Sequence, residues 1–324
     1  MTHRERVLAA IDGRSTDRIP ADYYGTAEAN QKYLAELGLM SDAELIARLD
    51  TDVVHVGPGP GRANFRRQKG YLKDIEDLRE IRRIQEDIPS LDELIDNSPL
   101  LDARRRFPDH ALLMGGPGSF FIGMCSMFGY ETALMHHALR PDIVELMTGM
   151  GIDYARGVID MLHRDTGNAV DILSFEDDYA TQETLYISAR AFRTFYKPAF
   201  AAVFAHAKRY GYRVQYHCCG AATELIPDFI EMGAEMLDPI QTSARGMDLA
   251  TLAARFKGRI CFHGGLDTQR LLPFGTPDDV RREVARLIAL LGTTRAFIAP
   301  SQHFLPDIPA ANLLAMYEAP RKGG

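Results

Sequence analysis

The sequence predicts a single-domain α/β protein built as a (β/α)8 TIM barrel. Short apolar runs rich in Val, Ile, Phe and Leu alternate with longer stretches of helical periodicity, which is the pattern of β-α units and a parallel sheet. About eight such runs occur in the 324 residues. Polar side chains gather where these runs end, as they do at the carboxyl ends of barrel strands.

The expected strands are residues 19–24, 52–57, 112–116, 172–175, 213–217, 236–240, 260–263 and 297–300. The expected helices include residues 141–162, 189–210, 222–232 and 277–291, the last with Thr276 as its N-cap and Pro277 in its first position. A doubly wound open sheet is the competing architecture, but no G-x-G-x-x-G sequence opens a helix after the first strand.

One segment departs from this rhythm. Residues 59–97 are rich in Arg, Lys, Asp and Glu, and they show no β-α alternation. We therefore expect an insertion, a hairpin and a short helix, that lies over the barrel mouth. No Gly/Ser/Pro linker divides the chain, and barrels of this length are common, so residues 1–324 are expected to form one domain.

The composition excludes several classes of function and partner. The chain is 46% hydrophobic and 25% charged, enough to bury a core without disulfides or a structural metal. Its net charge of −7 argues against nucleic acid or an anionic membrane as the main partner. The four cysteines form no secreted framework, and no apolar segment is long enough for a signal core or a membrane span. We expect a soluble, cytoplasmic protein that acts on small molecules; a homodimer fits these properties.

The polar residues at the strand ends predict where the chemistry takes place. They are His55, Gly115 to Gly118, Glu176 to Asp178, His217 to Gly220, Asp238, Gln241, His263 to Gly265, Asp267, and Ser301 to His303. We expect His55, Gln182, Gln241, His263 and Asp267 to bind substrate. The Gly115–Gly118 run permits backbone contact with a ligand or forms a turn. The run is not followed by the Lys-Ser/Thr of a phosphate-binding loop, so nucleotide binding is not expected.

The sequence His217-Cys218-Cys219-Gly220 is the most specific local signal for a metal. Side chains alternate along an extended segment, so His217 and Cys219 point to one side and Cys218 to the other. Imidazole and thiolate together suit Zn²⁺, and a catalytic zinc has three protein ligands and one open position. His303 is the first candidate for the third ligand and His263 the second. In the competing interpretation these cysteines are small buried apolar residues, and the role of Cys218 stays open.

Two successive carboxylates follow the fourth expected strand. Asp177 and Asp178 point to opposite sides, so one is expected to face the cavity and the other to cap the following segment or to pair with a basic group. A buried carboxylate beside a metal suits general acid or base catalysis. We therefore name Asp177, Asp178 and His303 as candidate catalytic residues.

Six segments of the chain resemble the uroporphyrinogen decarboxylase superfamily, and within it the cobamide-dependent methyltransferases. They are RERVLAAIDGRSTDRIP near the start, DDYATQ at 177–182, YHCCG at 216–220, LDPIQTSARGMD at 237–248, FHGGLDTQRLLPFGTP at 262–277 and AFIAPSQHFLPDIPAANLLAMYEAP at 296–320. Each segment alone is weak evidence for the family, but the six together are specific for it. The resemblance implies the same (β/α)8 barrel.

The methyltransferase branch binds zinc through a His-x-Cys pair and a later Cys, and uses it to activate a thiol that accepts a methyl group from a corrinoid protein. His217 and Cys219 match that pair, whereas Ser301-Gln302-His303 stands where the later Cys would be. The resemblance implies methyl transfer between a small molecule and a corrinoid. Because the chain has no Asp-x-His-x-x-Gly carrier motif, the corrinoid would be bound to a separate protein that docks at the barrel mouth, near residues 59–97.

Two alternatives to the methyltransferase stay open. A uroporphyrinogen decarboxylase would have an Arg-rich motif near residues 19–25, where this chain has IPADYYG. It would share a His in the loop after the last strand, where His303 lies. A binding or sensor barrel without catalysis is the other alternative, and the missing later Cys motivates it.

Overall fold

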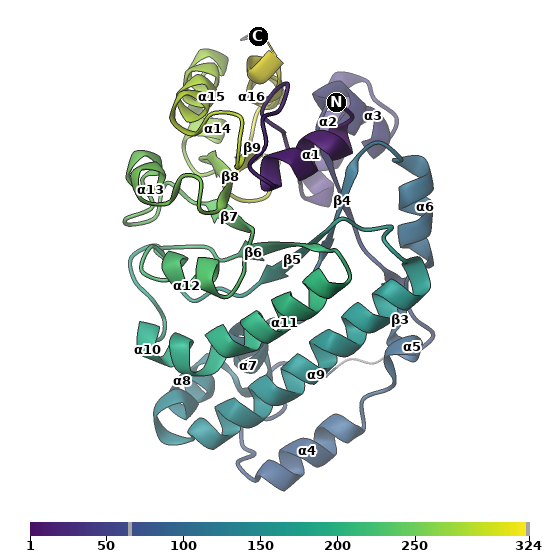
Figure 1. The fold of residues 1–324 in the computed structure, drawn as a ribbon, viewed down its shortest axis with the longest axis vertical. Helices are drawn as coiled ribbons and strands as arrows, with labels where there is room; N and C mark the ends of the chain where they lie inside the picture. Colours follow the sequence, from purple (N-terminus) through teal and green to yellow (C-terminus); the bar gives the residue numbers. More distant parts are fainter. Residues whose placement is uncertain (64–66, 322–324) are drawn as a thin grey trace.

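The computed structural model describes residues 1–63 and 67–321 and contains one parallel sheet, curled into a barrel-like form and surrounded by helices (Figure 1). We call it the barrel-like sheet, and the carboxyl ends of its strands its mouth. Neighbouring strands pair in the order β1-β4-β5-β6-β7-β8-β9. Their bounds are β1 (Val53–Val56), β4 (Ala111–Gly115), β5 (Ile172–Glu176), β6 (Arg213–His217), β7 (Met236–Ile240), β8 (Cys261–Leu266) and β9 (Ala296–Pro300).

The α/β class and the parallel sheet are confirmed, but the sheet has seven strands where eight were predicted. The expected first strand, residues 19–24, makes only one isolated bridge, which joins Ala21 to Ile298. Its backbone bonds to both edge strands: the amide of Asp22 donates to Ile298 O at 2.9 Å, and the amide of Asp52 donates to Ala21 O at 2.7 Å. Pro20 has no backbone N–H to donate, so residues 19–24 form fewer backbone hydrogen bonds than a regular strand would.

Helices cover the outer face of the barrel-like sheet, and α9 and α11 run side by side along it (Figure 1). Their bounds are α1 (His3–Ile11), α2 (Ala27–Leu37), α3 (Asp42–Leu49), α4 (Leu78–Glu86), α5 (Leu91–Leu94), α6 (Ser98–Arg106), α7 (Phe120–Phe128), α8 (Tyr130–Leu139), α9 (Pro141–Thr166), α10 (Ala189–Ala191), α11 (Lys197–Arg209), α12 (Ile226–Glu231), α13 (Leu249–Phe256), α14 (Leu271–Phe274), α15 (Pro277–Leu291) and α16 (Ala310–Glu318). A π-helical turn, Phe192–Tyr196, joins α10 to α11, and a 3-10 turn, Ala319–Arg321, follows α16.

Helix α15 begins and ends where the sequence predicts. The Thr276 side chain accepts a hydrogen bond from the Asp279 amide, and the Asp279 carboxylate accepts one from the Thr276 amide, so a capping box starts the helix. Helix α9 begins at the predicted Pro141 but continues past residue 162 to Thr166. The predicted helix 189–210 is divided by the π-helical turn, and the predicted helix 222–232 is reduced to α12.

The interior of the barrel-like sheet is closed at the amino ends of its strands by helix α1. Val7, Ala10 and Ile11 of α1 form one buried apolar cluster with residues from the strands. The strand members of this cluster are Val53, Ala111, Leu113, Ile172, Met236, Cys261 and Phe297. Since side chains alternate along a strand, residues two or four positions further on face the same interior, nearer the mouth.

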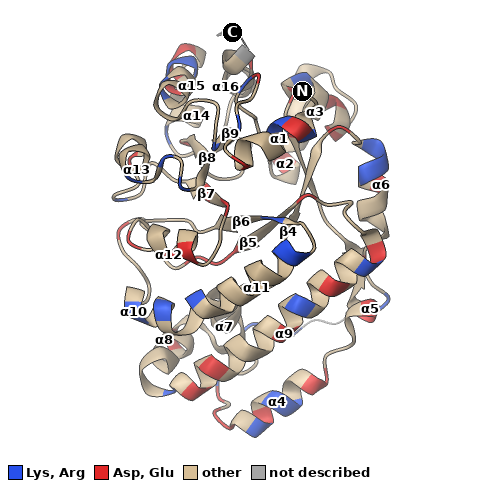
Figure 2. Cartoon of the chain, viewed as in Figure 1, with Lys and Arg blue, Asp and Glu red and all other residues tan. Residues whose placement is uncertain are grey.

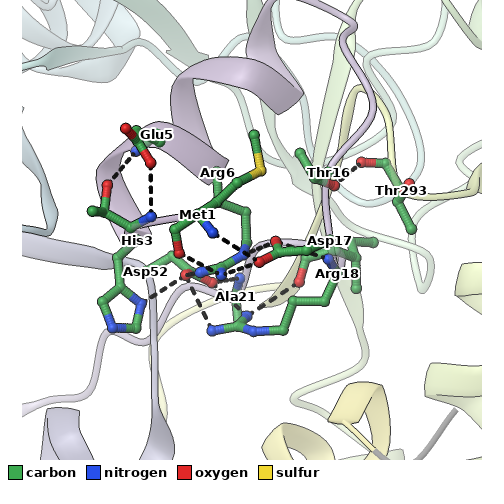
Figure 3. Close-up of polar contacts among 12 residues, drawn as sticks. Met1, His3, Glu5, Arg6, Thr16, Asp17, Arg18, Ala21, Asp52 and Thr293 are labelled. Atoms are coloured by element: carbon green, nitrogen blue, oxygen red, sulfur yellow. Dashed lines mark hydrogen bonds and ion pairs between the residues drawn. The ribbon is translucent and has the colours of Figure 1, made fainter. Parts of the chain in front are cut away.

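Asp52 ties the amino-terminal segments to strand β1 (Figure 3). Its side chain is fully buried and accepts hydrogen bonds from Arg6 at 2.5 Å, Arg18 at 2.6 Å, the Ala21 amide at 2.8 Å and His3 at 2.8 Å. Burial opposes ionisation, but these donors outweigh it and hold the pKa of Asp52 below its ordinary value.

The predicted insertion contains a two-stranded antiparallel ribbon, β2 (Gly59–Pro60) with β3 (Ile95–Asp96), and the helices α4 and α5. Residues 64–66 of this segment lie outside the described residues. The insertion contacts α7 through backbone bonds from Gly70 and Leu72, and α5 contacts α9. The ribbon therefore joins the two ends of the insertion, in place of the short hairpin that we expected.

Charge lies mainly on the outer helices: α4, α6 and α15 are dense in Lys, Arg, Asp and Glu, whereas α7 has no charged residue (Figure 2). Among the described residues, no helix combines the length and the apolar character needed to span a bilayer.

Candidate functional site

Strand β6 and the turn after it bring three ligand-type side chains together at the mouth. The Sγ of Cys219 lies 3.2 Å from Nε2 of His217. One oxygen of Asp178, which follows β5, completes a group whose ligand atoms all lie within 4.8 Å of one another. The predicted pairing of His217 with Cys219 on one side is therefore present. Cys218 points elsewhere: it is fully buried, and burial raises the pKa of its thiol well above the ordinary value.

The shape of this turn depends on Gly220. Its φ is +88°, and an added Cβ would lie 2.4 Å from Thr181 O and 2.7 Å from Ala180 O. The Gly220 amide donates to Oε1 of Gln241 at 2.7 Å, and the Cys219 amide donates to Oδ1 of Asp178 at 2.7 Å. The glycine is thus required by both backbone conformation and space, and two side chains hold the turn in place.

Asp238 of β7 orients the His217 ring. Nδ1 of His217 forms a short hydrogen bond with Asp238, so its Nε2 faces Cys219 and the open side of the group. Burial disfavours the charged ring, but the Asp238 carboxylate and Cys219 outweigh it and raise the pKa of His217 well above the ordinary value. A carboxylate behind a ligating imidazole is the usual outer partner of a zinc ligand.

The row of polar groups continues from Asp238 across the interior. Nδ1 of His263 lies 2.7 Å from Asp238, Nε2 of His263 lies 2.9 Å from Asp22, and Nε2 of His55 lies 2.9 Å from both Asp22 oxygens. An ionised carboxylate only accepts, so His263 donates from both nitrogens and is an imidazolium. Burial opposes this charge, yet the two carboxylates outweigh it and raise the pKa of His263 to about 9.

The two candidate acidic residues have different surroundings. Asp178 lines a cavity at the mouth. Asp177 is fully buried and accepts hydrogen bonds from the amides of Phe121 and Ile122 at 2.7 and 2.8 Å and from the Tyr179 hydroxyl at 2.5 Å. Burial raises the pKa of Asp177 to about 6, although these donors partly oppose the shift. Asp177 therefore caps the first turn of α7, and Asp178 is the residue that faces the cavity.

The loop after β9 reaches the group through Gln302. Its Nε2 donates to the Cys219 Sγ at 3.4 Å. His303, the first candidate for the third ligand, lies outside the group. Its Nδ1 contacts the Gln302 side chain at 2.9 Å, and its ring meets Tyr24 edge to face at 4.8 Å between centroids. His303 lines the cavity, and partial desolvation of its ring lowers its pKa below the ordinary value.

The cavity beside the group has a volume of about 520 Å³. Among its lining residues are Asp178, Cys219, His303 and the predicted substrate residues Gln182 and Gln241. Of the described residues that line it, none is Lys or Arg and none belongs to the insertion. The insertion instead borders a second, apolar cavity of about 550 Å³ against α7 and α9.

The remaining predicted substrate residues lie elsewhere. His263 is only 1% exposed and is bonded to two carboxylates, so it does not face the cavity. Asp267 lines a different hollow, and its carboxylate accepts a hydrogen bond from the Gln269 amide at 2.7 Å. His55 stands at the mouth beside Tyr24, with ring centroids 5.1 Å apart.

A zinc ion fits the donor set of the group. Thiolate, imidazole and carboxylate are the donor types that Zn²⁺ prefers, and Asp238 already supports the imidazole as a metal site requires. His217, Cys219 and Asp178 would hold the ion. His263, the second candidate for a third ligand, has both ring nitrogens engaged and is not available.

Asp22 is the one member of the row that the sequence analysis did not single out. It lies in IPADYYG, near the end of an expected strand, and is fully buried. The rule applied to the other strands, that polar residues near strand ends serve the site, would have found it.

These features define the class of protein: an α/β fold with a curled parallel sheet and polar groups at the carboxyl ends of its strands, as in the TIM-barrel enzymes. The chain belongs to the uroporphyrinogen decarboxylase family, because the family model described as "Uroporphyrinogen decarboxylase (URO-D)" matches residues 53–323. The family resemblance inferred from the sequence is thereby confirmed. No curated protein matches the sequence.

Two solved structures are similar in fold. A methyltransferase from Methanosarcina mazei superposes with a TM-score of 0.74 over 99% of this chain and 99% of that chain, at 17% sequence identity. A D-psicose 3-epimerase, determined with D-fructose, gives a TM-score of 0.40 over 86% of this chain and 89% of that chain, at 10% identity. The first likeness shows the fold over the full chain, and the second is too distant to support an argument.

Proposed function

We propose that this protein is a zinc-dependent methyltransferase that moves a methyl group between a small molecule and a corrinoid on a separate carrier protein. The observation that carries the proposal is the convergence of Cys219, His217 and Asp178 within 4.8 Å, at the wall of a cavity of about 520 Å³. The family and the fold shared with a methyltransferase support the same assignment.

The residues of the group have separate tasks. Bound there, Zn²⁺ would act as a Lewis acid that lowers the pKa of a thiol or water ligand. Asp238 fixes the His217 ring so that its Nε2 faces Cys219, where the ion would be held. The Gln302 amide donates to the Cys219 sulfur and so holds the loop after β9 against the group. Gln182 and Gln241 offer amide groups to a ligand in the cavity.

The lining of the cavity favours this activity over porphyrinogen decarboxylation. A porphyrinogen substrate has several carboxylates and needs cationic partners. The described residues that line the cavity include no Lys or Arg. A small, weakly charged substrate therefore matches the cavity better than a polycarboxylate.

Metal analysis of the purified protein tests the zinc site. We expect about one zinc per chain in the wild type and close to none in His217→Ala and Cys219→Ala. Cys218→Ala is the matched control, because this neighbouring thiol is buried and points away from the group. Near-zero zinc in all four proteins would remove the metalloenzyme proposal.

Activity with a methylated corrinoid protein and candidate thiol acceptors tests the reaction. We expect transfer in the wild type and none in Cys219→Ala. Turnover of uroporphyrinogen without methyl transfer would identify a decarboxylase. Zinc binding without turnover of either substrate would favour a binding or sensor protein.

The third ligand is tested by comparing two variants. We propose Asp178, because it belongs to the group, whereas His303 lies outside it. Asp178→Asn is expected to weaken zinc binding more than His303→Gln, by roughly tenfold or more. The reverse order would restore His303 as the ligand.

A further inference from the structure

The interior of the barrel-like sheet is open to solvent on one side of its mouth. Every residue of β7, β8 and β9 is buried, whereas His55 of β1, Gly115 of β4 and Glu176 of β5 are exposed. An added Cβ at Gly115 would meet no atom within 4 Å. All three residues follow interior-facing positions of their strands, so they face the interior. His55 lies outside the cavity of about 520 Å³, but the Tyr24 ring contacts both His55 and His303, and His303 lines that cavity. A ligand that extends from the cavity past His303 and Tyr24 therefore reaches His55.

Asp22 fixes the His55 ring. The Nε2 of His55 lies 2.9 Å from both oxygens of a carboxylate that is itself fully buried, while the His55 side chain is 35% exposed. Because the ionised carboxylate accepts, Nε2 carries the hydrogen and Nδ1 keeps its lone pair. No described residue forms a hydrogen bond with Nδ1. A buried carboxylate behind an accessible imidazole is the arrangement that orients a general base.

We infer that His55 is a general acid–base residue for the ligand bound at the mouth and that Asp22 is its positioning residue. The reaction assigned to His55 rests on the proposed function, whereas the contact between His55 and Asp22 is independent of that function. With a protic acceptor such as an alkyl thiol, the S–H bond breaks, its electron pair stays on sulfur and the proton forms an N–H bond at Nδ1. The proton then passes to water, which restores the free ring.

The neighbours of His55 leave its ring accessible. Asp22, Tyr24 and His303 face this ring or lie beside it, Glu176 ends β5, two strands further along the sheet, and His263 lies behind Asp22. His263 has both nitrogens engaged, so His55 is the member of this row that can exchange a proton with a ligand at the open side of the mouth.

Nitrogen NMR of histidine-labelled protein tests the geometry without any substrate. At alkaline pH we expect His55 to show a protonated Nε2 and an unprotonated Nδ1. In Asp22→Asn, which has nearly the same shape, the two tautomers should become mixed. A wild-type His55 with its proton on Nδ1, or a tautomer unchanged in Asp22→Asn, overturns the inference.

Kinetics with a methylated corrinoid protein and an alkyl thiol tests the role. We expect His55→Ala to keep its zinc, to lose methyl transfer by about 100-fold or more, and to recover part of it with added imidazole. His110→Ala is the matched control at the opposite end of the sheet, with no loss and no response to imidazole. An undiminished rate in His55→Ala overturns the inference. If the wild-type protein contains no zinc and transfers no methyl group, the proposed function is refuted instead. The NMR result alone then decides whether Asp22 positions His55.

Discussion

At the scale of single residues, a row of alternating imidazole and carboxylate groups crosses the interior of the barrel-like sheet. It runs from His217 through Asp238, His263 and Asp22 to His55. Each buried carboxylate lies between two imidazoles, which hold the pKa of Asp22 and of Asp238 well below their ordinary values against the effect of burial. Buried charges are tolerated here because every one of them is paired and hydrogen-bonded.

His263 should make the stability of the protein depend on pH. Its pKa is about 9 in the folded protein and lies near its ordinary value of about 6.5 in the unfolded chain. The charged ring therefore stabilises the fold fully below pH about 6.5, by up to about 3 kcal/mol, and this contribution is lost as the pH rises through about 9. Urea unfolding between pH 6 and pH 10 measures it.

His263→Gln should flatten this part of the stability curve, whereas the control His110→Gln should keep it. Parallel curves for wild type and His263→Gln would show that His263 is not the charged member of the row.

At the scale of elements, the amino end of α7 is held by a side chain from a distant strand. Ser119, the residue before α7, makes no capping bond to the helix amides; instead Asp177 accepts the Phe121 and Ile122 amides. This contact joins α7 to the loop after β5, in which Asp178 belongs to the metal group. One loop thus performs two tasks with adjacent carboxylates.

Asp177→Ala should destabilise the protein without affecting the proposed zinc site. The change leaves two helix amides and the Tyr179 hydroxyl without their buried acceptor, at a cost of about 3 kcal/mol. Chemical denaturation measures the loss, and zinc content serves as the control. Asp178→Ala is expected to do the opposite, with lower zinc affinity and a smaller effect on stability. A stable Asp177→Ala protein would show that α7 does not depend on this cap.

At the scale of the whole molecule, the amino-terminal segments fasten the two edges of the barrel-like sheet. Helix α1 fills the amino end of its interior, and residues 19–24 bond to both β1 and β9. Asp52 holds these segments together through Arg6, Arg18 and the Ala21 amide (Figure 3).

Asp52→Ala should lower the free energy of unfolding by about 3–5 kcal/mol, because it leaves two partly buried guanidinium groups without their shared partner. Asp17→Ala is the matched control: Asp17 also pairs with Arg6 but is 46% exposed, so about 1 kcal/mol or less is expected. Equilibrium denaturation compares the two variants. Equal effects would contradict the central role of Asp52.

The features that could be predicted from the sequence are local ones. The apolar runs predicted the parallel strands, and Thr276 with Pro277 predicted the start of α15, because both signals lie within a few residues. The alternation along an extended segment placed His217 and Cys219 on one side, since it depends only on neighbouring residues. The choice between Asp177 and Asp178 could not be made, because it depends on where the α7 amides lie.

The sequence by itself determined the α/β class, the family and the pairing of His217 with Cys219 on one side of the HCCG turn, because short-range periodicity and contiguous motifs encode them. Only the tertiary structure decided that Asp178 joins the group in place of His303 and that Asp22 links His263 to His55. His263 and Asp22 are 241 positions apart in the chain. Their contact exists because the sheet curls until residues 19–24 can bond both to β9 and to Asp52 beside β1, and no local pattern in the sequence specifies that curvature.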